Sequence, residues 1–484
     1  MSRLLSQSTN YVPRETEEPD VERTIPRGQR KPETSLLEDV AAAGLSKVYE
    51  RHGRIDLEPM PSDDSADPLN WSSWRKNTML GLVAWHTLMG PFSAAAVIPA
   101  FMVFSAEFGI SITQASYFVS VRVLQAIAAS PPQSIGAACV TEMFFVHERG
   151  QKMGIWALLV SLGTYLAPLV MGFVVYNKSW HWIFYLLSII FLAEFVLYIF
   201  LGPETLYVRT PRNRQLQTGQ TAANSVGPDG SQATVNAAPY AVSSDTNASR
   251  WLPAEVIAPL QMFLVPSVFL AASTYAVCFS YTNVLLVVET PALLGSKYML
   301  NPAILGLQNV AYLLGALIGE PIAGYGSDKY MAWRTKRQNG KRQAEYRLPF
   351  ALPGFVLIFI GILVFFIQLN NTSVGHWSVT PLIGGGIATF GLQLITTSCV
   401  TYAIDSQTPL GPLKARQAAI FTAFWRQLFA FLAPFYFPDA FTSLGYDGAG
   451  GLFASLQVLT VLFILLLMIF GQRWREAEYA KLAK

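Results

Sequence analysis

The chain has 484 residues, of which 52% are apolar and only 13% are charged, and its formal net charge is +3. Soluble domains usually carry about 25% charged residues, so this composition excludes an ordinary soluble protein and indicates a membrane protein. The small net charge also argues against nucleic-acid binding, and we expect no nucleic-acid partner.

The first predicted segment, residues 1–75, is polar and rich in Glu, Arg, Pro and Ser. It lacks the basic, apolar and small-residue order of a cleavable signal peptide. A segment of this composition buries too little apolar surface to fold alone. We therefore expect a disordered cytoplasmic tail.

Ten apolar segments follow, and each exceeds or approaches the roughly 20 residues that a helix needs to cross a bilayer. Polar, low-complexity sequence separates the first four from the last six. The sequence thus predicts an all-α polytopic membrane protein with a four-span bundle at 76–208, a cytoplasmic linker at 209–257, a six-span bundle at 258–471 and a cytoplasmic tail at 472–484. The predicted spans are 77–104, 117–145, 154–176, 182–201, 259–288, 303–325, 348–369, 381–403, 417–437 and 451–470.

Basic residues predict how these spans are oriented. The loop at 329–347 is strongly basic, and further Lys and Arg residues flank the same ends of the other spans. Near the opposite ends we find only Lys178 and Lys297. Because basic loops stay in the cytoplasm, this bias places both termini inside. It also favours a single span at 117–145, since two spans there would turn the basic loop outward.

Ionisable residues within the predicted spans are candidate functional groups, because burying one costs at least ~2.5 kcal/mol on insertion scales. His86 is either a titrating group or a hydrogen-bonded core histidine. Arg122 and Arg426 belong either to a substrate or proton pathway or to structural ion pairs. Glu194 has no partner nearby in the sequence, and its role is open. Glu289, near the outer end of its span, favours an interfacial position. Glu320 precedes Pro321 near an inner end, where a partner such as Arg334 or a helix terminus could satisfy it.

Signatures of enzymes and metal sites are missing from the sequence. There is no phosphate-binding loop, no zinc-protease motif and no nucleophile elbow. Cys139, Cys278 and Cys399 fall inside apolar segments at spacings that fit neither a metal site nor a disulfide framework. We expect no enzyme, no cofactor and no metal, and an ion or solute gradient as the energy source. Asn370 and Asn371 begin overlapping sequons in a predicted outer loop and are glycosylation candidates.

Glycine and proline recur at spacings that allow helices to approach closely or bend. Gly163, Pro168 and Gly172 lie in the third predicted span, and Gly315, Gly319 and Gly324 lie in the sixth. Small residues of this kind suit helices that move against one another. Ordinary helix packing in a polytopic protein is the alternative.

Several short motifs resemble those of fungal major facilitator superfamily transporters of the drug:proton antiporter type. In the first half they are Asp67-Pro68-Leu69-Asn70-Trp71, Arg122-Val123-Leu124-Gln125 followed by Gly136 and Glu142, Arg149-Gly150 with Gly154, the stretch from Gly163 to Gly172, the stretch from Trp180 to Phe184, and Pro203-Glu204-Thr205-Leu206. In the second half they are Gly315, Gly319, Gly324 and Asp328 with the basic loop after them, and Tyr402 with Asp405. The chain departs from the family at Thr164, where the family usually has proline.

The resemblance implies roles for these positions. Arg122, with Gln125 beside it, matches the motif whose arginine is implicated in proton coupling, so we place both in a proton or substrate pathway with His86, Glu194 and Arg426. The antiporter and gating motifs imply a conformational role for a second set, in which we include Glu320. That set is Glu142, Arg149, Gly163, Pro168, Gly172, Gly315, Gly319, Glu320, Gly324 and Asp328.

The family's transporters have twelve spans, whereas ten are predicted here. The stretch from Gln114 to Val121 resembles the opening of the family's second helix, and Arg122 resembles the opening of the fourth. Two spans and their loop, roughly 50 residues by span length, are therefore missing between Val121 and Arg122. Losing two spans preserves the orientation of every later one.

The resemblance implies a secondary active transporter in the plasma membrane, with protons and a small molecule as its ligands, the lipid bilayer around it and a monomeric state. The leading expectation is proton-coupled efflux of a small amphipathic compound, such as a drug or fungal metabolite. Proton-coupled import of a nutrient or polyamine is an alternative, and so is a non-transporting sensor or an inactive splice or gene-model product. Because paired bundles must match in order to rock about a central site, we expect the shortening to impair transport.

Overall fold

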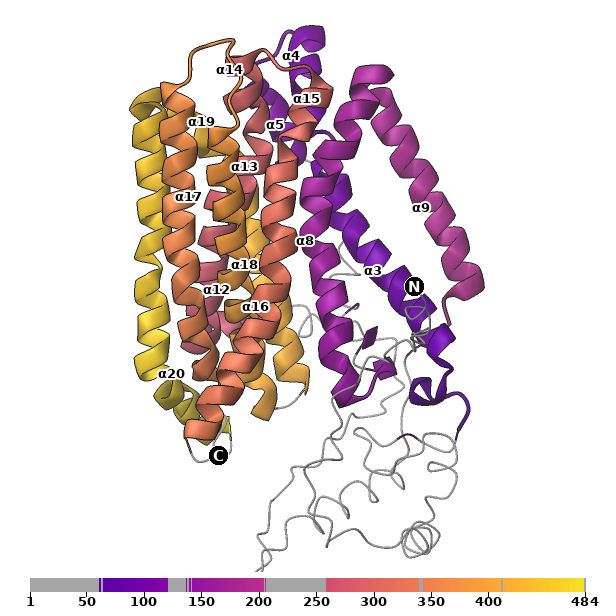
Figure 1. The fold of residues 1–484 in the computed structure, drawn as a ribbon. Helices are drawn as coiled ribbons and strands as arrows, with labels where there is room; N and C mark the ends of the chain where they lie inside the picture. The colour runs from indigo at the N-terminus through magenta and orange to yellow at the C-terminus, as the bar shows by residue number, and fades with distance from the viewer. Residues whose placement is uncertain are drawn as a thin grey trace, which may run out of the picture.

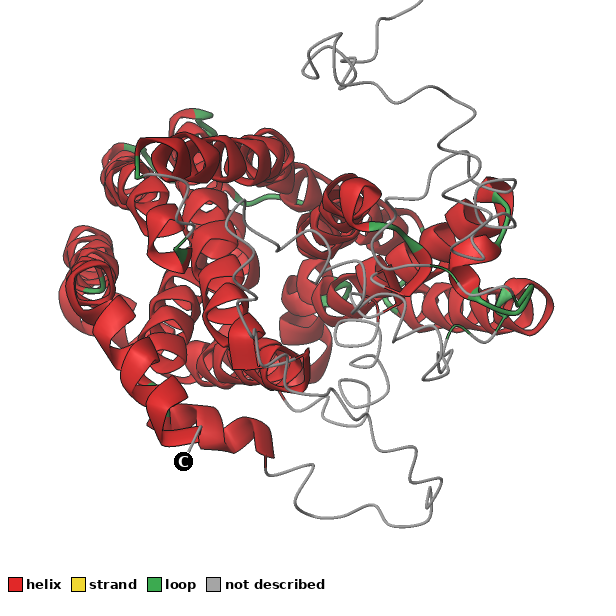
Figure 2. Cartoon of the chain, turned by 90° about the horizontal axis from the view of Figure 1, so that it is seen from below, coloured by secondary structure: helices red, strands yellow, loops and turns green. Residues whose placement is uncertain are grey.

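The computed structural model describes residues 61, 64–120, 136, 139, 140, 142–203, 205, 258–338, 343–410 and 412–482. Within these ranges nearly all the chain is helical, and Figure 2 shows the helices packed side by side with short loops between them. The predicted all-α fold is therefore confirmed. Most of the predicted tail at 1–75 and all of the predicted linker at 209–257 lie outside the described residues.

The first half begins with a short, tightly bonded turn that leads into the first long helix. Buried Asp67 accepts a hydrogen bond from the backbone N–H of Leu69, and Lys76 Nζ donates to the Leu69 carbonyl oxygen at 2.9 Å. The helices that follow are α3 (Ser73–Ala95), the turn η3 (Ile98–Ala100), α4 (Phe101–Phe108), α5 (Ile112–Ser120), α8 (Val146–Asn177) and α9 (His181–Leu201). Ser72 caps α3, because its hydroxyl accepts from the N–H of Arg75.

The second half contains more helices, and several of them are interrupted. They are α12 (Pro266–Phe279), α13 (Leu285–Val288), α14 (Ser296–Tyr298), α15 (Pro302–Leu307), α16 (Asn309–Arg337), α17 (Leu352–Asn371), α18 (Thr380–Gln407), α19 (Pro412–Leu459) and α20 (Val461–Leu482). A π-helical turn, η5 (Ser280–Val284), joins α12 to α13. The 3-10 segment η7 (Ala344–Ala351) leads into α17.

Eight helical segments among the described residues are long and apolar enough to cross a membrane. The last of them, Lys414–Ala480, holds two predicted spans, 417–437 and 451–470, on either side of Gly445. Gly445 has φ 69° and ψ 178°, a conformation open to glycine that interrupts the helix there. Nine of the ten predicted spans thus coincide with helices. The tenth, 117–145, is described only near its two ends, so the total of ten stays a prediction.

Glycines let the helices of the second half pack backbone to backbone. A Cβ atom on Gly384 would lie 2.6 Å from the Phe365 nitrogen and 2.7 Å from the Gly361 oxygen. A Cβ on Gly361 would lie 2.5 Å from the Ala388 nitrogen. Real Cβ atoms are not found so close to backbone, so α17 and α18 sit in contact only because these positions carry glycine.

The two halves meet along α8, which lies beside α15 and α16 (Figure 1). A second contact joins α5 to α19, where the rings of Tyr117 and Phe435 stack with centroids 4.8 Å apart. Helix α9 packs on α3 and α8 at the far side of the molecule (Figure 1). Only 17% of the most apolar stretch of α9 is buried, whereas 83% of the most apolar stretch of Pro266–Val288 is buried. Helix α9 therefore leaves most of its surface open to lipid.

Helix α20 runs beyond the last predicted span and packs against its neighbours. Tyr479 donates a hydrogen bond to the Ser406 carbonyl oxygen at 2.6 Å, and Arg475 Nη2 lies 2.8 Å from Glu345 Oε2. The segment predicted as a tail, 472–484, is therefore helical and attached to the bundle through Leu482.

Candidate functional site

A histidine–carboxylate pair links α3 to α9 in the first half. His86 Nδ1 lies 2.6 Å from Glu194 Oε1. The Glu194 side chain is 3% exposed and that of His86 is 26% exposed. The sequence singled out both residues but gave no partner for Glu194, because 108 positions separate them. Packing of α9 on α3 brings them together.

One of the two carboxylate oxygens of Glu194 has no hydrogen-bond partner among the described residues. The Tyr198 ring lies edge-on to the His86 ring, with centroids 5.8 Å apart, and covers one side of the pair. Glu194 Oε2 is buried and has no hydrogen-bond partner among the described residues. Since buried carboxylate oxygens are normally bonded, Oε2 is an exception within the described residues.

Arg426 is the buried cation of the second half. Its side chain, on α19, is 8% exposed, and Nη1 donates to the Tyr275 hydroxyl on α12 at 3.0 Å. The guanidinium carbon lies 4.6 Å from the centre of the Phe279 ring. No carboxylate within the described ranges pairs with Arg426, so the structural ion pair considered for it is not present there.

The contacts that Arg426 does make offset only part of the cost of burying its charge. A cation over an aromatic ring gains about 0.5–2 kcal/mol. A hydrogen bond from a charged donor contributes about 1.5–3 kcal/mol. Removing an ion from water costs several kcal/mol even after relaxation. Nε of Arg426 also has no hydrogen-bond partner in the described part of the chain.

A glycine-lined contact joins the two halves near one end of the molecule. A Cβ on Gly172 of α8 would lie 2.5 Å from the Pro302 oxygen and 3.1 Å from Gly306 Cα on α15. Gly306 in turn faces the backbone of Pro168. On another face of α8, Gly163 lies against the backbone of Leu88 on α3, where a Cβ atom would meet the Leu88 oxygen. The sequence identified Gly163, Pro168 and Gly172 but missed Gly306, whose only signal was a glycine early in the sixth predicted span.

Charged residues at one end of the second half form a three-membered cluster. Arg347 Nη1 lies 2.7 Å from Asp328 Oδ1 on α16, and Arg347 Nε lies 3.1 Å from Asp405 Oδ2 on α18. The sequence singled out Asp328 and Asp405 separately and counted Arg347 only as one of many inside charges. This cluster joins the ends of α16, η7 and α18.

The remaining conformational candidates are dispersed. Glu142 precedes α8, and Arg149 lies in the first turn of α8. Glu320 Oε1 accepts from the Thr397 hydroxyl at 3.4 Å. Gly315 and Gly319 face α18, and a Cβ on Gly319 would lie 3.1 Å from the Phe390 oxygen. Gly324 has open space around it, so close packing does not require glycine there. Arg122 and Gln125 lie outside the described residues.

Other predicted features are placed as follows. Asn370 and Asn371 are exposed at the end of α17, and the Asn370 amide donates to Asp447 Oδ2 at 2.6 Å. The three cysteines are buried and free. Within the described ranges, no group of His, Cys, Asp and Glu residues is arranged to hold a metal ion.

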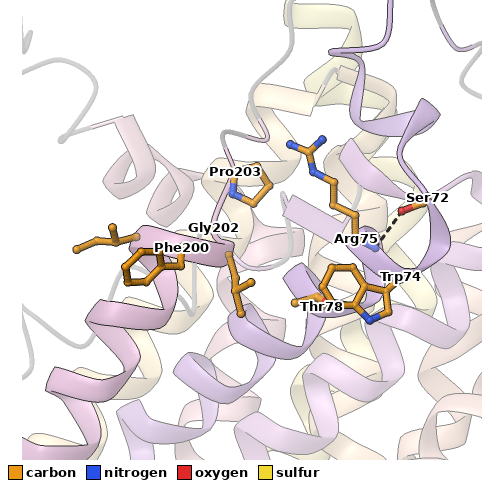
Figure 3. A pocket seen from close by; sticks show the side chains of 9 residues that line it. Ser72, Trp74, Arg75, Thr78, Phe200, Gly202 and Pro203 are labelled. Atoms are coloured by element: carbon orange, nitrogen blue, oxygen red, sulfur yellow. Dashed lines mark hydrogen bonds between the residues drawn. The ribbon is translucent and has the colours of Figure 1, made fainter.

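A shallow hollow of about 420 Å³ lies between the start of α3 and the end of α9 (Figure 3). Its lining includes Ser72, Trp74 and Arg75 from α3 and Phe200 and Pro203 from the end of α9. Trp74 is 72% exposed and Phe200 is 79% exposed, as expected for aromatic residues at a membrane interface. Neither the His86–Glu194 pair nor Arg426 lines it.

Long apolar helices that bury a few charged groups define a polytopic membrane protein. Residues 78–434 match the family model described as the Major Facilitator Superfamily. The chain therefore belongs to the Major Facilitator Superfamily. It is 26% identical to an uncharacterized MFS-type transporter of Schizosaccharomyces pombe over 550 aligned positions that take in 92% of each chain.

Other relatives are fungal as well. The MFS-type transporter penM of Penicillium rubens is 25% identical, with 86% of this chain and 88% of penM covered. The efflux pump radE of Floropilus chiversii is 25% identical, with 82% of this chain and 72% of radE covered. Among solved structures, a peptide transporter POT in complex with sulfate is 15% identical, covers 83% of this chain and 95% of its own, and has a TM-score of 0.47.

Proposed function

We propose that this transporter is built for proton-coupled export of a small amphipathic compound across the plasma membrane. The observation that carries the proposal is the His86–Glu194 pair, which places two titratable groups 2.6 Å apart inside the membrane-spanning part of the first half. Buried ionisable groups in transporters commonly serve proton pathways.

The pair offers a simple way to bind and release one proton. Histidine is the side chain that ordinarily changes charge between pH 5 and 8. With a proton on the imidazole, His86 and Glu194 form an ion pair of zero net charge. Loss of that proton leaves a net negative charge in a largely buried place, which favours a different packing of α9 on α3. Proton binding thereby biases the arrangement of helices in this half.

Export is supported by the name of one relative and not by the pair itself, and the amphipathic cargo rests on the resemblance to drug:proton antiporters. One relative carries the name efflux pump, and others are named MFS-type transporters. Import of a polyamine would be favoured by acidic groups free to bind a cationic cargo. Glu194, one residue with which to test this, pairs with His86.

We further propose that the chain as it stands transports poorly, because its first half lacks two spans. The alignment with the S. pombe relative runs over 550 positions, more than the 484 residues of this chain, so the relative contains residues without a counterpart here. Alternating access requires two halves that rock against each other as matched bodies. A half with four spans offers a reduced surface for that motion.

The test compares this chain with a restored chain, in which a relative's two missing spans and their loop are inserted between Val121 and Arg122. Both are reconstituted in vesicles that contain a pH-sensitive dye, and neutral, cationic and anionic amphipathic compounds are added under a pH gradient. We expect compound-dependent proton flux in the restored chain and at least ~10-fold less in the natural chain, within the usual range of coupling energies. Equal flux in both chains would show that the shortening is harmless.

A further inference from the structure

We infer that Arg426 is the anchor of a binding site for an amphipathic organic anion, and specifically for a carboxylate on an apolar or aromatic body. The inference rests on the proposed function, since it names the class of cargo that the exporter carries. Its basis is the surroundings of the guanidinium, which none of the sequence motifs explained.

The guanidinium is buried, held in place and without an anion. Tyr275 and Phe279 lie one turn apart on α12 and fix two sides of it, through a 3.0 Å hydrogen bond and a ring 4.6 Å away. The neighbouring Trp425 donates to Ser273 on the same helix at 3.0 Å, which anchors α19 to α12 directly beside Arg426. One of the five guanidinium donors is used in a hydrogen bond within the described residues, and buried Nε is unused.

The undescribed stretch at 121–135, within the first half, contains neither Asp nor Glu. Among the described acids none forms an ion pair with Arg426. A bound anion can supply the counter-charge that this cation does not receive from the described residues.

The rings beside Arg426 define the rest of the ligand. Its guanidinium carbon lies 5.7 Å from the centre of the Tyr275 ring and 4.6 Å from that of Phe279. An apolar or aromatic body packs well against these rings, while its charged end is bound by the planar guanidinium fork. A single cation matches a single negative charge, so a carboxylate fits better than a doubly charged phosphate.

Helix α19, which carries Arg426, also takes part in the contact between the two halves. It packs on α5 of the first half, where Tyr117 stacks on Phe435. In a two-bundle carrier a transported molecule has to bind between the halves.

The experiment measures binding to the purified natural chain in lipid nanodiscs by calorimetry, with no proton gradient. The probes are three aromatic carboxylates, phenylbutyrate, naphthylacetate and indole-acetate, each matched with its neutral amide. We expect at least one carboxylate to bind at least ~10-fold more tightly than its amide, and Arg426→Gln to abolish that preference. Arg426→Lys keeps the charge without the planar fork and should retain a weaker preference.

Two further variants control for unfolding. Arg416→Gln removes an exposed arginine from the same helix and should leave the preference unchanged. Tyr275→Phe removes the hydrogen bond that orients the guanidinium, and should weaken carboxylate binding several-fold while the preference over the amide persists. Thermal unfolding of each variant shows whether the protein is intact.

The inference is overturned if no carboxylate binds better than its amide, or if the preference survives in Arg426→Gln. Because no gradient is applied, this outcome is independent of coupled transport. Carboxylate selectivity without proton flux in the restored chain would contradict the proposed function alone. Proton-coupled flux of only neutral or cationic compounds would contradict the carboxylate site alone.

Discussion

Replacing Glu194 by glutamine in the restored chain is expected to reduce flux driven by a pH gradient about ten- to a hundredfold, the range of typical coupling free energies. Glutamine has the size of glutamate and can still bond His86 across the 2.6 Å contact, but it does not carry the negative charge that holds a proton on the pair. Exchange of compound without a pH gradient should persist, because the cargo site is separate from this pair.

The control separates coupling from stability. His86→Ala leaves the carboxylate of Glu194 buried without its partner, so we expect it to lower the free energy of unfolding by about 1–3 kcal/mol. In the double variant His86→Gln and Glu194→Gln a neutral hydrogen bond replaces the pair, so stability should recover while gradient-driven flux stays low. Normal gradient-driven flux in Glu194→Gln would remove the pair from the mechanism.

Substitution of Gly172 by leucine is expected to force the two halves apart at their contact between α8 and α15. The first atom of the new side chain would lie 2.5 Å from the Pro302 oxygen, which belongs to backbone and cannot rotate away. Overpacking of this kind usually lowers the free energy of unfolding by about 1–3 kcal/mol. Here the clash lies between the first and the second half, so it pushes the two halves apart. We expect a lower unfolding temperature and a longer distance between spin labels on the ends of α8 and α15.

Gly81 provides the matched control. It lies on α3, it is exposed, and a Cβ there would meet nothing within 4 Å. Gly81→Leu should therefore change neither the unfolding temperature nor the distance between the labels. If Gly172→Leu behaves in the same way as Gly81→Leu, the halves do not depend on a close backbone contact at this point.

The fold could largely be predicted from the sequence, because a bilayer imposes a strong rule on long apolar segments. Nine predicted spans coincide with helices. Gly163 lies against α3, and Pro168 and Gly172 lie against α15, which fits a moving interface and ordinary helix packing alike. The break at Gly445 also falls between two predicted spans. Span length and small-residue spacing are local signals, and the sequence displays them directly.

The site could be predicted only in part, because its contacts join residues far apart in the chain. The sequence shows that His86 and Glu194 are both costly to bury, but their pairing depends on how α9 packs on α3. Arg347 was hidden among many basic residues, and its position between Asp328 and Asp405 depends on the path of η7. For Arg426 the sequence left an ion pair and a pathway equally open, and the absence of an acid among its described neighbours favours the pathway.

The measurement that tests the predicted orientation and the even number of spans in the first half most directly is the sidedness of two tags, one at the N-terminus and one in the linker at 209–257. An even number of spans between them, four by prediction, returns the chain to the side on which it began. Protease added to intact cells should cleave neither tag, and protease added to inside-out vesicles should cleave both. Cleavage of the linker tag in intact cells, with the N-terminal tag protected, would mean that an odd number of spans separates them and would contradict the four-plus-six arrangement.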